Sequence, residues 1–198
     1  MSDRSGRPET GVPNQSSAYN IRIYPLPDSA ARSLEEFLYL AVFVPEGAEP
    51  PPRAILEEPG VAVYLDNFGR QPGDLALVAE RGGVLLGAVW ARYIHGYGHL
   101  DENTPELAIS VRPEARGQGT GCGLLRALLR TLREQGVRHV SLAVQKGNLP
   151  ARGLYHKLGF TPVRETQEEL ILRACLHDDA CQDDDNNKTE GEKNPCTR

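Results

Sequence analysis

Residues 107–125 read LAISVRPEARGQGTGCGLL, and this stretch decides the fold that we expect. Its first five residues, LAISV, are strand formers, and Arg112-Pro113 marks a turn. Three glycines follow at alternate positions, Gly117, Gly119 and Gly121. In residues 121–135, leucines at helical spacing predict a helix with one buried face, and Gly136 is expected to end this helix. The stretch therefore predicts a strand, a glycine-rich turn and a helix that follows the turn directly.

Such a turn is suited to binding an anion. Glycines leave the backbone N–H groups unobstructed, and the dipole at a helix N-terminus favours negative charge. A P-loop is excluded because Cys122, Gly123 and Leu124 stand where Gly-Lys-Ser/Thr is needed, and no GxGxxG dinucleotide spacing is present. The residues thus predict a phosphate-binding turn of another kind, or else a glycine-rich turn without a ligand.

The flanking sequence alternates between strand and helix patterns. We expect strands at 19–25, 74–80, 84–94, 107–111, 140–144, 160–163 and 170–172. Helical patterns cover 29–43, 53–65 with a break near Pro59 and Gly60, 121–135, and 151–158, which Gly159 ends. This alternation predicts an α/β layered fold, with one central sheet covered by helices.

The net charge of −5 over 198 residues is concentrated at one end of the chain. Residues 177–198 alone carry −4, and the other 176 residues carry −1. A nearly neutral body without a basic cluster argues against nucleic acid and against a membrane surface as partners. The sequence has no apolar run of the roughly 18 residues that a membrane span needs.

The composition divides the chain into three parts. Residues 1–18 are polar and rich in Ser, Gly and Pro, residues 177–198 are acidic, and we expect both to be disordered segments. Residues 19–176 form the expected single domain. Since residues 1–20 lack the apolar stretch of a secretory signal, we expect a cytoplasmic protein.

The cysteines do not form a metal-binding pattern. Cys122, Cys175, Cys181 and Cys196 include no CxxC pair and no histidine at zinc-finger spacing. We expect reduced thiols. We also expect no metal site, either at the i, i+4 pair of His177 and Cys181 or elsewhere.

Two motifs in this order resemble those of the GNAT superfamily of N-acetyltransferases. The first is V111-x-P-x-x-R-G-Q-G-x-G121, which is similar to the superfamily's loop for the pyrophosphate of acyl-CoA. The second is V144-Q-K-G-N-x-x-A-x-x-L-Y-x-x-L-G-F160, which resembles its later strand, Asn-x-x-Ala helix and Leu-Gly-Phe turn. The resemblance covers residues 19–176, and it implies a mixed, mostly antiparallel sheet of six to seven strands with about four helices.

The resemblance also implies how acetyl-CoA is bound as co-substrate. Backbone amides around Gln118 to Cys122 would hold the pyrophosphate, and Arg116 would support the loop or a phosphate. Backbone groups of Ile109 and Val111 would line the pantetheine arm, and Asn148 would contact the cofactor. The full implied binding set is Ile109, Val111, Arg116, Gly117, Gln118, Gly119, Thr120, Gly121, Cys122, Asn148 and Tyr155.

Acetyl transfer to an amine requires a proton donor for the departing sulfur and a neutral nucleophile. The resemblance places Tyr155 as the donor; a core tyrosine is the alternative. In several family members a glutamate lies about 13 residues before the loop arginine, but that position holds Asn103, which is not a base. Glu106, on the strand itself, and Glu102 are the candidate bases, with deprotonation by water as the alternative.

The acceptor is expected to bind at loops near the sheet. The segment HGYGHLDENTP, residues 95–105, carries His95, Tyr97 and His99, and together with PEGAEPPPR, residues 45–53, it is our candidate for the acceptor pocket. Asp101 and Glu102 would suit a cationic amine. Trp90, on the preceding strand, is expected in the core.

The resulting hypothesis is an acetyl-CoA-dependent N-acetyltransferase acting on a primary amine of a small molecule or peptide. The alternative is a non-catalytic acyl-CoA-binding or regulatory module on the same fold. We expect an amine acceptor as partner, and neither nucleic acid nor a membrane. The sequence is compatible with a homodimer.

Overall fold

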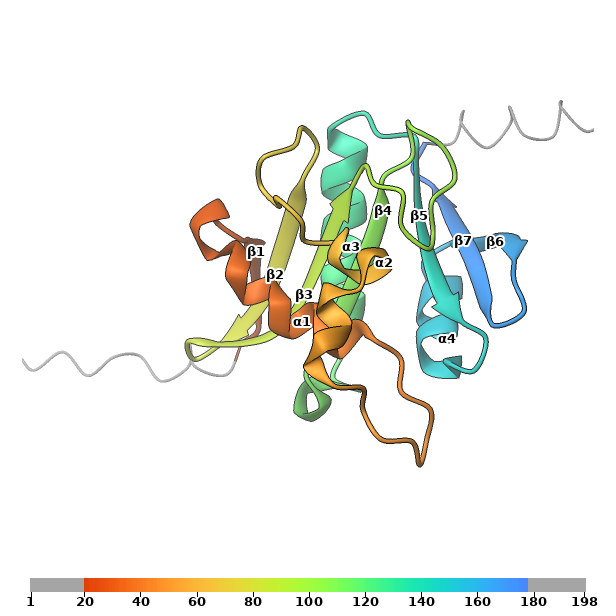
Figure 1. The fold of residues 1–198 in the computed structure, drawn as a ribbon. Helices are drawn as coiled ribbons and strands as arrows, with labels where there is room; N and C mark the ends of the chain where they lie inside the picture. The colour runs from red at the N-terminus through yellow and green to blue at the C-terminus, as the bar shows by residue number, and fades with distance from the viewer. Residues whose placement is uncertain (1–19, 178–198) are drawn as a thin grey trace, which may run out of the picture.

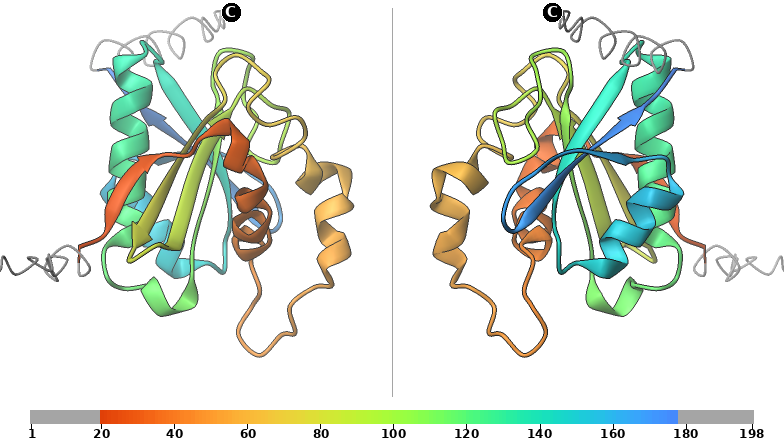
Figure 2. Two further views of the ribbon diagram at one scale, coloured as in Figure 1. Left: turned by 90° about the vertical axis from the view of Figure 1, so that its left-hand side faces the viewer. Right: turned by 90° about the vertical axis from the view of Figure 1, so that its right-hand side faces the viewer.

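The computed structural model describes residues 20–177, apart from the side chains of residues 28 and 29. The expected terminal segment 1–18 and, except for His177, the expected segment 177–198 lie outside the described residues, as do Tyr19, Cys181 and Cys196. The described part consists of a seven-stranded sheet with helices on both faces (Figures 1 and 2).

The order of the strands across the sheet is their order along the chain, except that β7 lies between β5 and β6. The sheet order is β1-β2-β3-β4-β5-β7-β6, and every neighbouring pair is antiparallel except β4 and β5. The sheet is therefore mixed and mostly antiparallel, as the family resemblance implied. The strands are β1 (Arg22–Pro25), β2 (Leu75–Arg81), β3 (Val84–Arg92), β4 (Glu106–Val111), β5 (His139–Gln145), β6 (Thr161–Glu165) and β7 (Glu169–Cys175).

One face of the sheet is covered by α3 (Thr120–Glu134) and α4 (Leu149–Lys157). Five leucines of α3 were predicted to form its buried face. Leu124, Leu125, Leu128 and Leu132 are buried, whereas Leu129 is partly buried and packs against the same core. Gly136, with φ +81°, ends this helix, and the N–H of Val137 reaches back to the carbonyl of Leu132. Gly159, with φ +85°, follows α4 in the same way.

The other face is covered by α1 (Leu34–Ala41) and α2 (Pro59–Ala62). Two helical predictions change in detail here. The 29–43 pattern divides into a 3-10 helix, Asp28–Ser33, and α1. The 53–65 pattern divides at Glu58 into a 3-10 helix, Arg53–Glu57, and α2, because Pro59 begins the second helix at a position where its missing N–H costs nothing.

The two halves of the sheet separate at one place. β4 and β5 run in parallel and are in register only at Glu106 and Ser141, next to the bond from the Ser141 N–H to the Pro105 carbonyl (3.0 Å). Beyond this point β5 leaves β4, and α4 lies below the opening in Figure 1. This divergence leaves one edge of β4 without a strand partner.

Candidate active site

The free edge of β4 presents backbone groups to the opening. The N–H of Arg112 donates to Leu86 on the β3 side (2.8 Å), and successive residues of a strand direct their backbone groups to opposite edges. Ile109 and Val111 lie three residues and one residue before Arg112. Their backbone N–H and C=O groups therefore point to the opposite edge, towards the gap beside β5. These are the two residues implied by the family resemblance to line the pantetheine arm.

The glycine-rich turn lies at the C-terminal end of β4. After a short 3-10 helix, Pro113–Ala115, Gly117 and Gly119 adopt positive φ angles of +70° and +82°. Gly119 is the N-cap of α3, whose first hydrogen bond runs from the N–H of Gly123 to the Gly119 carbonyl (2.9 Å). The amides from Gly119 to Cys122 therefore have no acceptor within the helix.

The space above the turn is open. A Cβ atom added at Gly117 or Gly119 would meet nothing within 4 Å, and one added at Gly121 would contact Leu154 of α4 and Val111 of β4. The open amides and the N-terminus of a fifteen-residue helix meet at the end of the β4 edge, an arrangement that favours a negatively charged group.

Side chains of the same stretch hold the turn in this shape. The Arg116 Nε donates to the Val111 carbonyl (3.0 Å), so in this structure Arg116 supports the loop. The Gln118 Nε2 donates to the Glu114 carbonyl (2.7 Å), and the buried Thr120 hydroxyl donates to the Ala115 carbonyl (3.2 Å). These three contacts are local, which explains why so much of the loop is recognisable in the sequence.

The other end of β4 carries a buried carboxylate. Glu106 is the first residue of the strand and is only 1% exposed. Its Oε1 accepts hydrogen bonds from the N–H of Gly98 (2.7 Å) and from the Tyr64 hydroxyl. Its Oε2 is buried against Gly96 without a well-formed hydrogen bond to any described residue. One oxygen of a buried acid is thus left for a further partner.

Burial raises the pKa of Glu106 to about 6. The loss of hydration is the main cause, and it is opposed by the hydrogen bonds from Tyr64 and Gly98 and by the nearby backbone amide of Gly96. The negative charge of Glu169 raises the pKa further. A carboxyl with this pKa is mostly ionised at neutral pH. Because its pKa lies near that pH, it can both accept and release a proton, as a general base requires.

Tyr64 is a site residue that the sequence did not reveal. It follows α2 and lies 42 positions from Glu106, and its hydroxyl also accepts the N–H of Tyr97 (3.1 Å). Burial and the neighbouring Glu106 raise the pKa of Tyr64, so the hydroxyl remains a donor. A single tyrosine in an apolar stretch carries no sequence signal for this role, because the contact depends on how two distant segments pack.

Tyr155 lies on α4 and is 7% exposed. Its ring packs against Phe160, with centroids 5.7 Å apart, and its hydroxyl has no hydrogen bond to another described residue. Burial raises the pKa of Tyr155, which keeps the phenol protonated.

Asn148 is the N-cap of the same helix, and its Oδ1 accepts the N–H of Ala151 (3.3 Å). The helix begins at Leu149, two residues before the predicted 151, because of this cap.

The structure separates the two candidate bases. The side chain of Glu102 is 77% exposed and contacts His95, with 3.0 Å between Oε1 and Nε2, whereas Glu106 is buried at the start of β4. Asn103, the position aligned with the family's glutamate, is also exposed, and its N–H donates to the Asp101 carboxylate (2.8 Å). Only Glu106 combines burial with contact to the turn between His95 and His99.

The remaining predictions concern packing. Trp90 is fully buried, and its Nε1 donates to the Tyr64 carbonyl (3.2 Å), so it belongs to the core, as expected. Cys122 forms no disulfide with another described residue, and the thiol of Cys175 donates to the His177 carbonyl (3.3 Å).

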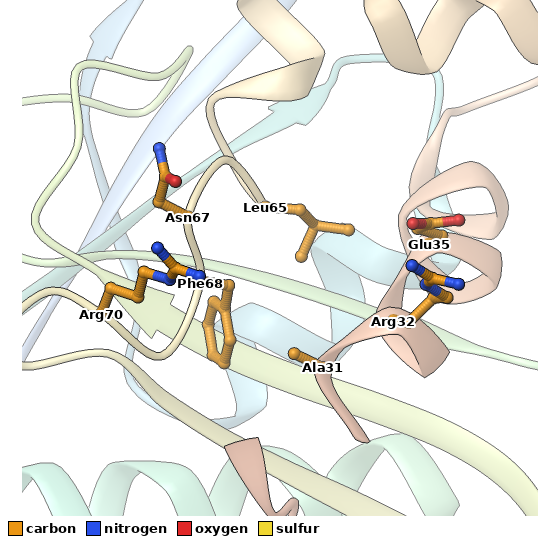
Figure 3. A pocket seen from close by; sticks show the side chains of 7 residues that line it. All are labelled: Ala31, Arg32, Glu35, Leu65, Asn67, Phe68 and Arg70. Atoms are coloured by element: carbon orange, nitrogen blue, oxygen red, sulfur yellow. The ribbon is translucent and has the colours of Figure 1, made fainter. Parts of the chain in front are cut away.

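A surface pocket of about 280 Å³ lies elsewhere, beside α1 (Figure 3). It is lined by Ala31, Arg32, Glu35, Leu65, Asn67, Phe68 and Arg70. No residue of the glycine-rich turn and no partner of Glu106 lines this pocket, so it is separate from the candidate site.

The chain belongs to the acetyltransferase (GNAT) family, because the family's sequence model matches residues 38–160. It is similar to mycothiol acetyltransferase from Pseudarthrobacter chlorophenolicus, with 30% identity over 127 residues, which are 64% of this chain and 39% of that protein. It is also similar to the L-methionine sulfoximine/L-methionine sulfone acetyltransferase from Pseudomonas aeruginosa, with 32% identity over 101 residues, or 49% and 56% of the two chains. The chain thus spans less than two thirds of either curated relative.

Solved structures support the same fold. The ribosomal-protein-S18-alanine N-acetyltransferase from Escherichia coli superimposes with a TM-score of 0.56 at 18% identity, covering 79% of this chain and 94% of that one. The PaiA N-acetyltransferase from Thermoplasma acidophilum, solved in complex with coenzyme A, gives 0.59 at 20% identity, covering 79% and 99%. Among residues 20–177, no helix has the length and apolar character needed to cross a membrane.

Proposed function

We propose that this chain is an acetyl-CoA-dependent N-acetyltransferase that transfers the acetyl group directly to a primary amine of a small molecule or peptide. The observation that carries the proposal is the arrangement along β4. An anion-binding turn lies at one end of its free edge, and a buried carboxylate with an unsatisfied oxygen lies at the other. The five residue steps between them span about 17 Å of extended backbone, along which an extended ligand arm can bind.

In this proposal the turn binds the pyrophosphate of the co-substrate through the amides of residues 118–122, with Arg116 supporting the loop. Ile109 and Val111 bind the pantetheine amides as a neighbouring strand would. Asn148 uses its Oδ1 to cap α4, which leaves its amide N–H groups for the cofactor. These contacts orient the thioester towards the Glu106 end of the site.

Glu106 accepts a proton from the amine as its nitrogen attacks the thioester carbonyl carbon. The nitrogen–carbon bond forms and the carbon–sulfur bond breaks, and Tyr155 donates its proton to the departing sulfur. The products are an amide and the free thiol of coenzyme A. Tyr155 then regains a proton and Glu106 loses one, through solvent, so that the cycle closes.

The surroundings of Glu106 favour a cationic acceptor. Glu169 on β7 contributes negative charge at this carboxylate, and burial raises its own pKa while Gln145 donates a hydrogen bond to it (2.8 Å). Two carboxylates that act on one region attract an ammonium group before it is deprotonated. The relatives named above act on amines of different kinds, so the substrate class, and not one acceptor, is proposed here.

The test has two readouts on the full chain. First, thermal unfolding is followed with increasing acetyl-CoA, and a concentration-dependent rise in melting temperature is expected. Second, release of free thiol is measured over polyamines, aminoglycosides, amino acids and N-terminal peptides. Absence of a thermal shift at millimolar acetyl-CoA would overturn the proposal. A shift without thiol release for any amine would instead favour a non-catalytic acyl-CoA-binding module.

A further inference from the structure

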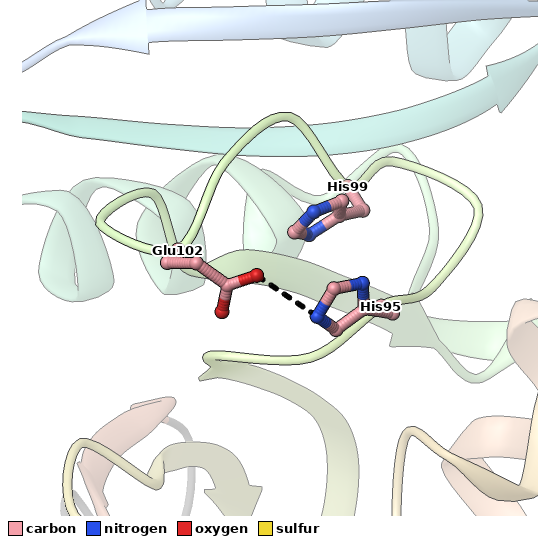
Figure 4. A group of neighbouring side chains, drawn as sticks. All are labelled: His95, His99 and Glu102. Atoms are coloured by element: carbon pink, nitrogen blue, oxygen red, sulfur yellow. Dashed lines mark ion pairs between the residues drawn. The ribbon is translucent and has the colours of Figure 1, made fainter.

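Three side chains with metal-ligating atoms meet in the loop between β3 and β4. His95, His99 and Glu102 point towards one another in Figure 4, and one ligand atom from each lies within 4.8 Å of the other two. The spacing H-x3-H-x2-E places all three within eight residues of one loop. Neither a CxxC pair nor a zinc-finger spacing includes this set.

The hydrogen bonds around the group prepare it for coordination. The carbonyl of Ile94 is an acceptor only, so the Nδ1 of His99 at 3.1 Å is the protonated nitrogen, and Nε2 keeps the lone pair. Bonds of this kind commonly fix the tautomer of a metal-ligating histidine. His95 Nε2 lies 3.0 Å from the Glu102 carboxylate, so two of the ligand atoms are already side by side.

The two imidazole rings stack with centroids 4.0 Å apart and an angle of 23° between them. Coordination of one ion requires the two Nε2 atoms to converge, so one ring has to turn. His95 is exposed and is free to do so, whereas His99 is partly buried and held by Ile94. Binding therefore needs the rotation of one surface side chain, without a change in the backbone.

We propose that His95, His99 and Glu102 form a binding site for a divalent transition-metal ion, with Zn²⁺ as the probe. Two imidazoles and one carboxylate are the ligands that zinc and its neighbours prefer, whereas magnesium and calcium prefer sets made of oxygen alone. Three protein ligands on an exposed loop leave at least one coordination position for water or a ligand. This site departs from the sequence-based expectation that no metal is bound.

The site is connected to the candidate active site through the turn Gly96-Tyr97-Gly98, which the two histidines flank. Gly98 donates to Glu106 (2.7 Å), and Tyr97 donates to the Tyr64 hydroxyl (3.1 Å). The turn is tightly packed, because a Cβ atom at Gly96 would lie 2.6 Å from Glu106 Oε2. An ion bound to both histidines joins the two ends of this turn and fixes the groups that hold Glu106.

Two consequences follow, and they are separable. Metal binding rests only on the three side chains. A change in acetyl-transfer rate when the metal binds rests in addition on the proposed function, since it requires Glu106 to act in the reaction. A direct binding measurement therefore tests the site whether or not the chain is an active acetyltransferase.

The experiment uses the full chain without an affinity tag and with reduced thiols. Zn²⁺ binding is measured by calorimetry, and Co²⁺ is titrated in parallel to follow its ligand-field absorption. One equivalent is expected to bind to the unaltered chain. Loss of an outer-shell partner alone costs about 10- to 100-fold in affinity, so His95→Ala and His99→Ala are each expected to weaken this equivalent at least as much.

The controls are an exposed histidine on α4 and a cysteine of the C-terminal region. His156→Ala and Cys181→Ser are both expected to retain the equivalent with unchanged affinity. Melting temperatures without metal establish that the variants fold. The proposal is overturned if no equivalent binds, if His95→Ala and His99→Ala bind as the unaltered chain does, or if Cys181→Ser alone removes the equivalent.

Discussion

The Tyr64 hydroxyl donates a hydrogen bond to the Glu106 carboxylate and joins the segment after α2 to the first residue of β4. The two residues lie on different elements, 42 positions apart, and both are buried. This contact opposes the effect of burial on Glu106, because a donor stabilises the ionised carboxylate. The proton affinity of the proposed base therefore depends on a residue outside both family motifs.

Replacing Glu106 by Gln removes the proposed base while keeping an acceptor for Gly98. We expect turnover of an amine substrate to fall about 10²- to 10⁴-fold, with little change in acetyl-CoA affinity. The measurement is thiol release together with calorimetry of acetyl-CoA binding. Glu134→Gln, an exposed change on α3, is the matched control. Equal turnover in the Glu106 and Glu134 variants would show that water removes the amine proton.

Glu106 also predicts how stability depends on pH. Its pKa is raised in the fold from 4.5 to about 6, so the folded chain binds this proton more tightly than the unfolded chain does. The associated stabilisation is present below pH 4.5 and is lost as the pH rises to about 6, with a size of about 2 kcal/mol. Urea unfolding of the unaltered chain and Glu106→Gln at pH 5 and pH 7 measures it. A difference between the two proteins that is the same at both pH values would contradict the prediction.

Tyr64→Phe removes the donor but keeps the ring. We expect the pKa of Glu106 to rise above about 6, so the acidic limb of the kcat/KM profile moves to higher pH. Loss of one buried hydrogen bond to a charged group also destabilises the fold by about 1.5–3 kcal/mol. A rate profile measured from pH 5 to 9 tests the shift. Destabilisation with an unmoved profile would make Tyr64 a structural residue only.

Tyr155→Phe tests the proposed acid. The Tyr155 hydroxyl has no hydrogen bond to another described residue, so the fold is expected to lose little stability. Turnover is expected to fall about 10²- to 10⁴-fold, while acetyl-CoA affinity is largely retained. Tyr24→Phe on the edge strand β1 is the control, since its hydroxyl donates to Glu80 on β2. Full turnover of the Tyr155 variant on a true substrate would remove it from the mechanism.

Gly119→Ala separates the effect of the turn from general backbone strain. Gly119 and Gly136 have φ angles of +82° and +81°, and neither has an atom within 4 Å of an added Cβ. Both substitutions are therefore expected to destabilise the fold by about 1–2 kcal/mol. Only Gly119→Ala, at the N-terminus of α3, is expected to weaken acetyl-CoA binding as measured by calorimetry. Equal affinities would mean that the turn does not bind the co-substrate.

Asp74 and Arg92 form a buried ion pair at the end of β3, with 2.8 Å between Oδ1 and Nε. Arg92 also donates to the Val63 carbonyl (3.0 Å), next to Tyr64. Asp74→Ala leaves a buried guanidinium without its carboxylate, so we expect a loss of about 3–5 kcal/mol in the free energy of unfolding. Chemical denaturation measures this loss. The exposed pair of Arg53 and Glu36 is the control, and its disruption is expected to leave the free energy of unfolding almost unchanged.

The sequence by itself determined the parts of the molecule that are built from neighbouring residues. The turn from Arg116 to Gly121, the buried leucines of α3 and the glycines that end α3 and α4 are all consequences of local patterns, because the bonds that form them span only a few residues. The two family motifs were visible for the same reason, and with them the order of strands and helices.

The tertiary structure decided which side chains meet. Burial of Glu106 and exposure of Glu102, four residues apart, depend on where β4 begins beneath the 95–105 loop. The contact from Tyr64, the separation of β4 from β5 beyond Ser141, and the meeting of His95, His99 and Glu102 depend likewise on packing. Desolvation and hydrogen bonding between segments distant in sequence set the chemistry of these groups, and such effects leave no periodic pattern along the chain.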